Sequence, residues 1–140
     1  MFSNDHPREV DVMTGKLATR QIDETTLNAL AQFFQKDVPI LIDLYLKDSE
    51  KQLSKLKLHI EQQETKHIQR VAKELRQSSL DIGALRFSFI ILSLEIALNE
   101  HRVQEWGRVL KVIEDHYRQV VDELATLRFA YTRSPSFATS

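Results

Sequence analysis

Five histidines are the side chains of this sequence best suited to proton or phosphoryl transfer near neutral pH. The ordinary pKa of an imidazole is about 6.5, so its neutral form is available as a nucleophile. Glu64 and His67 have the Glu-x-x-His spacing of metal sites in helical bundles, but the sequence contains no second such pair. We therefore expect no metal, no cofactor and no enzyme, and interpret the histidines as surface residues: His6, His59, His67, His101 and His116.

Other nucleophiles and phosphate-binding motifs are lacking. The sequence has no cysteine, which excludes disulfides, thiolate nucleophiles and cysteine-based metal sites. Ser78 and Ser79 are not surrounded by a nucleophile-elbow motif. Gly83 is the only glycine in the middle of the chain, and one glycine cannot form a phosphate-binding loop. We expect the two serines to face a neighbouring helix.

A basic stripe is the most specific pattern of charge. Lys66, Arg70, Lys73 and Gln77 fall at i, i+4, i+7 and i+11, which places them on one face of a helix, with Arg76 beside them. Such a stripe is either a solvated surface or a surface for an acidic partner. It contains few charges and no interleaved aromatic residues, so we do not expect it to bind nucleic acid.

Composition limits the remaining classes. The 140 residues suit one domain, and 42% hydrophobic with 28% charged residues is an ordinary globular balance. The formal net charge of -1 gives no general attraction to nucleic acid or to an acidic membrane. The most apolar stretch, 87–98, is shorter than the ~20 residues that span a bilayer. We expect a cytoplasmic protein without a membrane segment.

The pattern of apolar residues predicts an all-helical chain. Apolar residues recur at helical spacing from residue 23 onwards, and then over 37–59, 65–82, 84–99 and 103–127. Pro39 suits the first turn of the second helix, and Gly83 suits the end of the third. Long amphipathic helices with short connections predict an antiparallel bundle. We divide the chain into an N-terminal arm (1–21), a bundle (22–129) and a disordered tail (130–140).

The stretch 72–95, AKELRQSSLDIGALRFSFIILSLE, carries a family resemblance. It resembles the signature of the histidine phosphotransfer (HPt) domain, in which the helix with the active histidine reads approximately A-H-x-L-K-G-S-S-x-x-I-G-A and the next helix ends in x-L-E. The helices before and after it also resemble those of the family, over roughly 22–127. The resemblance implies an antiparallel four-helix bundle of HPt type with an additional N-terminal helix. The matching residues are Ala72, Leu75, Ser78, Ser79, Ile82, Gly83, Ala84, Leu94 and Glu95.

Two positions depart from the signature. Lys73 stands at the position of the phosphorylatable histidine, and Gln77 stands at the glycine one helical turn further on. In the family, that glycine leaves room for the imidazole and for the approaching receiver domain. An exposed lysine has an ordinary pKa of about 10.4 and is protonated at neutral pH, so it has no lone pair to attack a phosphoaspartate. His67 lies about 240° around the helix from Lys73 and does not share its face.

We therefore predict a pseudo-HPt protein that binds the receiver domain of a response regulator, or a hybrid histidine kinase, without carrying a phosphoryl group. The alternatives are a helical adaptor with a non-receiver partner, and an HPt protein that uses a relocated histidine. An apolar stripe predicts a surface for a homodimer, unless the N-terminal helix or arm covers it: Phe89, Leu92 and Ile96. The predicted partner-binding residues are Lys66, Arg70, Lys73, Arg76, Gln77 and Leu80.

Overall fold

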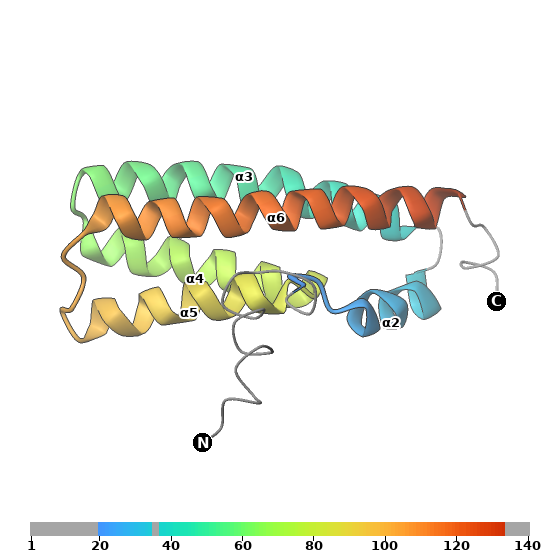
Figure 1. The fold of residues 1–140 in the computed structure, drawn as a ribbon, viewed down its shortest axis with the longest axis horizontal. Coiled ribbons are helices and arrows are strands. Elements are labelled where there is room, and N and C mark those ends of the chain that lie inside the picture. Colours follow the sequence, from blue (N-terminus) through green and yellow to red (C-terminus); the bar gives the residue numbers. More distant parts are fainter. Residues whose placement is uncertain (1–19, 35–36, 134–140) are drawn as a thin grey trace, which may run out of the picture.

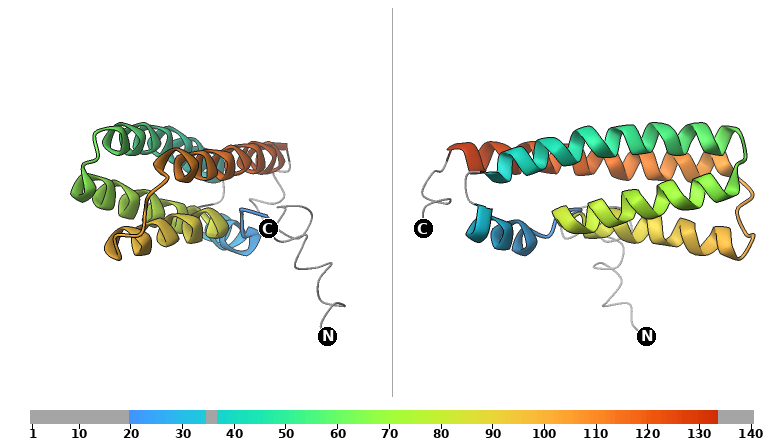
Figure 2. Two further views of the ribbon diagram at one scale, coloured as in Figure 1. Left: turned by 60° about the vertical axis from the view of Figure 1, so that its left-hand side comes forward. Right: turned by 180° about the vertical axis from the view of Figure 1, so that it is seen from behind.

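The computed structural model describes residues 20–34 and 37–133. Four long helices form an antiparallel bundle, with α3 and α6 in one layer and α4 and α5 in the other (Figures 1 and 2). The short helix α2 lies beyond the α4–α5 connection, beside the extended ends of α3 and α6 (Figure 1). The helices are α2 (Glu24–Phe34), α3 (Val38–Glu61), α4 (Thr65–Ile82), α5 (Leu85–Asn99) and α6 (Trp106–Arg133).

The all-α bundle predicted from apolar spacing is confirmed, and the last helix differs most from its predicted range. It begins at Trp106 instead of residue 103, because the connection contains His101 with φ 55° and Val103 packs against the core from this connection. It also continues past the predicted end at 127 to Arg133. Tyr131 explains the extension, since its ring is buried and its hydroxyl donates to Asn28 Oδ1 of α2 over 2.7 Å. Residues 1–19 of the predicted arm and 134–140 of the predicted tail lie outside the described residues.

Gly83 joins α4, α5 and the start of α2. It ends α4 with φ 92°, a left-handed conformation that glycine adopts at little cost. Its carbonyl accepts a 2.7 Å hydrogen bond from the amide of Asp23. A Cβ atom at this position would lie 3.0 Å from Thr26 Cβ, so the glycine also permits the close approach of α2.

A polar layer crosses the otherwise apolar core. The Tyr45 hydroxyl of α3 lies 2.7 Å from Ser79 Oγ of α4, and Ser49 Oγ of α3 lies 2.8 Å from the Tyr117 hydroxyl of α6. Burial raises the pKa of the Tyr45 hydroxyl well above its ordinary value, so this group stays neutral. Because each hydroxyl has a partner on another helix, the layer fixes the register of three helices. Ser79 faces a neighbouring helix, as the sequence predicts.

No helix within the described ranges combines the length and the apolar character needed to cross a membrane.

Candidate functional site

The face of α4 that points away from the core carries the basic stripe. Lys66, Arg70, Lys73 and Gln77 are all exposed, while the opposite face of α4 is buried. None of the three cations forms an ion pair with any residue in 20–34 or 37–133. The stripe therefore presents three uncompensated positive charges along about 10 Å of helix, given a rise of 1.5 Å per residue.

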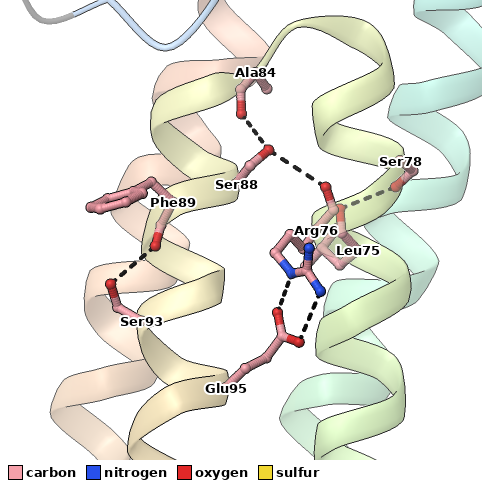
Figure 3. A network of polar contacts seen from close by, with 8 residues as sticks. All are labelled: Leu75, Arg76, Ser78, Ala84, Ser88, Phe89, Ser93 and Glu95. Carbon is pink, nitrogen blue, oxygen red and sulfur yellow. Dashed lines mark hydrogen bonds and ion pairs between the residues drawn. The ribbon is translucent and has the colours of Figure 1, made fainter.

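Arg76 differs from the other predicted partner-binding cations because it is used inside the bundle. Its Nε and Nη2 atoms donate to the two carboxylate oxygens of Glu95 on α5, over 2.5 and 3.2 Å (Figure 3). Both side chains are mostly buried, with 21% and 15% of their surface exposed. The hydrogen bond that the guanidinium donates to Glu95 raises the pKa of Arg76, which keeps it charged. The geometry assigns Arg76 to holding α4 against α5.

A groove next to the basic stripe was not predicted from the sequence. It has a volume of about 500 Å³ and lies between α2, α3 and the end of α4. Asp81 lies one helical turn beyond Gln77 on α4, so the groove continues the surface that carries Lys73. Leu80, 38% exposed, lies next to Asp81 in the chain. The lining is mostly apolar: Leu30, Phe34, Leu41, Leu44, Tyr45, Asp48, Ser78, Asp81 and Ile82.

The sequence indicates this groove only in part, through apolar residues that turn out to be exposed. Phe33 and Phe34 end α2 with 80% and 50% of their surface exposed, and Leu44 of α3 is 58% exposed. Adjacent aromatic residues at a helix end indicate that one of them faces outward. However, the position of α2 across the end of α4 depends on the contact with Gly83, which helical periodicity does not reveal.

The histidines of the described residues do not lie on the outward face of α4. The rings of His59 and His67 stack with centroids 4.9 Å apart at the α3–α4 turn. His101 is exposed in the α5–α6 connection. The half-buried His116 of α6 accepts a hydrogen bond at Nδ1 from the Gln21 side chain over 2.9 Å. Burial and the nearby charge of Arg86 lower its pKa.

The carboxylate of Glu64 contacts the other histidine of this turn. Its Oε1 lies 2.9 Å from Nδ1 of His59. The described part of the chain contains no group of three or more histidine, cysteine, aspartate or glutamate side chains that could hold a metal ion.

The predicted dimer residues lie on α5, away from the basic stripe. Phe89 and Ile96 are 67% and 44% exposed, whereas Leu92 is half-buried. Phe89 points to the side of α5 opposite α4 (Figure 3). The sequence prediction thus places two separate surfaces on the bundle, one basic and one apolar.

Comparison with solved structures identifies the fold. The chain is similar to the crystal structure of histidine-containing phosphotransfer protein B from Pseudomonas aeruginosa PAO1, with a TM-score of 0.67. The two sequences are 18% identical, and the match covers 84% of this chain and 96% of the other. No family model and no curated protein matches the sequence. The chain therefore has the all-α fold of a histidine phosphotransfer protein, with α2 as the additional N-terminal helix.

Proposed function

We propose that this protein is a pseudo-HPt signalling protein, which binds the receiver domain of a response regulator or a hybrid histidine kinase and carries no phosphoryl group. A single observation carries the proposal. Lys73, which stands at the histidine position of the resembled signature, is exposed on the outward face of α4 and has no ion-pair partner among the described residues. The fold resembles that of a phosphotransfer protein, whose chemistry requires a neutral nucleophile that lysine does not supply at neutral pH.

The surroundings of Lys73 favour binding over transfer. Lys66 and Arg70 extend the positive charge along α4, and the apolar groove begins one to two helical turns beyond Lys73. A charged contact beside an apolar groove suits a protein partner, since electrostatics steers the encounter and apolar burial supplies affinity. The Lys73 ammonium would enter the acidic phosphorylation pocket of the receiver and compete there with a metal ion or a phosphoryl group. The protein then acts as a decoy that modulates a phosphorelay.

The first experiment places a photo-crosslinking residue at Gln77 in the native host and identifies the captured protein. Gln77 lies one turn from Lys73 on the same face, and Lys57, which is exposed on α3, provides the control position. Capture of a receiver or histidine kinase from position 77 but not from position 57 is expected. Capture of only an unrelated protein, or of none, contradicts the proposal.

A charge reversal tests the role of Lys73 with the identified partner. Lys73→Glu places a carboxylate against the acidic pocket, and we expect the affinity to fall at least about tenfold. Lys57→Glu makes the same change of charge on another face and is expected to leave the affinity nearly unchanged. If the two substitutions lower the affinity equally, binding depends on the overall surface charge and not on Lys73 in particular.

The exposed residues of α5 support a second candidate function, a helical adaptor that self-associates or binds a non-receiver partner. Phe89 is the observation that favours it, because a phenylalanine with 67% of its surface exposed is costly to leave in water. Crosslinks from Gln77 and from the α5 surface distinguish the two functions, since each reports on a different face of the bundle.

A further inference from the structure

An apolar stripe on α5 lacks cover from the described residues. Leu85, Phe89, Leu92 and Ile96 fall at i, i+4, i+7 and i+11, and we call them the α5 stripe. Three of them are 43%, 67% and 44% exposed: Leu85, Phe89 and Ile96. A contiguous apolar strip of this kind marks a surface that another segment or another protein covers.

The described chain begins near the first residue of α5 and is anchored to α6. The Gln21 side chain is fully buried, and its Nε2 donates to His116 Nδ1 and to Gln119 Oε1 of α6, over 2.9 and 3.1 Å. The backbone amides of Gln21 and Ile22 donate to the carboxylate of Glu123 over 3.0 Å. The point at which the preceding segment leaves the bundle is therefore fixed against α6.

The direction of the chain at this point leads along α5. Ile22 forms an antiparallel bridge with Ala84, the residue before α5. In an antiparallel pair, moving backward along one segment means moving forward along the other. From Ile22 toward the N-terminus, the chain thus runs in the direction in which α5 proceeds from Leu85 toward Phe89 (Figure 1 shows the start of the described chain beside this end of α5).

The length and composition of the preceding segment suit the stripe. The distance from residue 85 to residue 96 along a helix is about 17 Å, which about six extended residues span. Nineteen residues precede Arg20, and five of those from position 10 onward are apolar: Val10, Val12, Met13, Leu17 and Ala18. A segment tethered at one end of its binding surface also has a high effective concentration there.

We propose that residues 10–19 of this chain cover the α5 stripe, with the Gln21 anchor as the fixed end of the contact. A second copy of the chain is a weaker candidate, because a stable interface buries about 800 Å² per partner and the stripe is one face of one helix.

Paramagnetic NMR on the full chain tests this contact. The sequence has no cysteine, so one introduced cysteine takes one nitroxide label. Ser93→Cys labels the exposed surface of α5 one turn beyond Phe89, and Ser54→Cys labels the exposed surface of α3 as a matched control. We expect the amide signals of residues 10–19 to lose most of their intensity with the label at 93 and to keep it with the label at 54. Unchanged signals with the label at 93 overturn the proposal.

A mixed sample identifies the source of the broadening. ¹⁵N protein without a nitroxide is mixed with ¹⁴N protein that carries the nitroxide. Only contacts between copies can then broaden the observed ¹⁵N signals. We expect no broadening in this sample, and broadening equal to that of the directly labelled protein overturns the proposal in favour of a second copy. Phe89→Ser supplies an independent readout, because removing the exposed ring should shift the amide signals of residues 10–19. An unchanged spectrum for those residues contradicts the contact.

Discussion

Arg76 and Glu95 form a two-pronged ion pair that joins α4 to α5, with distances of 2.5 and 3.2 Å between the guanidinium nitrogens and the carboxylate oxygens. In the sequence, Arg76 stands three residues after Lys73 and has the same charge. The structure separates their roles. Arg76 faces α5 and is mostly buried, whereas Lys73 faces outward and is exposed.

Removing one member of this pair is expected to destabilise the bundle. Arg76→Ala and Glu95→Ala should each lower the free energy of unfolding by about 2 kcal/mol, because each leaves a mostly buried charge without its partner. The double variant should lose less than the sum of the two, since the single losses describe one shared interaction. Urea denaturation of the four proteins measures the coupling. Strictly additive losses would show that the pair is not coupled in solution.

Lys73→Ala is the control for that cycle. Its side chain is exposed and forms no ion pair with the described residues, so we expect the free energy of unfolding to change by less than about 0.5 kcal/mol. A large loss would mean that Lys73 is part of the bundle's packing and not available to a partner.

Substituting alanine for each of two glycines should change the free energy of unfolding in opposite directions. Gly83→Ala puts a side chain at φ 92° and 3.0 Å from Thr26 Cβ, so we expect a loss of about 1–2 kcal/mol in the free energy of unfolding. Gly107→Ala adds a methyl group in the first turn of α6, where nothing lies within 4 Å, and should gain up to about 1 kcal/mol. Thermal unfolding of both variants checks the contrast. A gain at position 83 would contradict the close approach of α2.

Acid should weaken the fold through His116. Burial and the charge of Arg86 lower its pKa in the folded chain below the ordinary value of about 6.5, so the unfolded chain binds the proton more readily. The contribution of His116 to stability is therefore complete above about pH 6.5 and is lost as the pH falls from there through the lowered pKa. Denaturation of the wild type and of His116→Gln between about pH 7.5 and 5 measures this difference. Parallel pH dependences of the two proteins would exclude His116 as the source.

The sequence predicts the helices well because apolar spacing and burial have the same origin. Leu75, Ser79 and Ile82 recur on one face of α4, and that face is buried in the bundle. The helix ends that depend on distant contacts are predicted less well. Nothing local in the sequence shows that Tyr131 meets Asn28, and this contact accompanies the extension of α6 beyond residue 127.

In the candidate site too, features set by local spacing are predicted well, and features set by contacts between helices are not. Exposure of Lys66, Arg70, Lys73 and Gln77 follows from their place on the polar face of one helix. The pairing of Arg76 with Glu95 of α5 cannot be predicted in this way. Arg76 lies beside Lys73 on the same helix, and the sequence does not show which neighbouring helix each side chain meets. The groove between α2, α3 and α4 likewise requires knowing where α2 packs.

The resemblance implies that this chain lacks phosphotransfer activity, because Lys73 stands at the histidine position. Two substitutions should introduce that activity. Lys73→His supplies a nucleophile that is neutral near pH 7, and Gln77→Gly removes the side chain one turn away that would crowd the imidazole and the receiver. We expect the double variant, incubated with a phosphorylated receiver domain, to gain the mass of one phosphoryl group. The glycine lies within α4 and should cost up to about 1 kcal/mol of stability, which the bundle can tolerate.

The single variants and the wild type separate the two effects. Lys73→His alone should accept the phosphoryl group slowly or not at all, because the Gln77 side chain remains on the same face. Gln77→Gly alone and the wild type should accept none, since a protonated lysine has no lone pair for the attack. Phosphorylation of the wild type at another residue would favour a relocated histidine. A folded double variant that binds the receiver but stays unmodified would contradict the placement of Lys73 at the position of the active histidine.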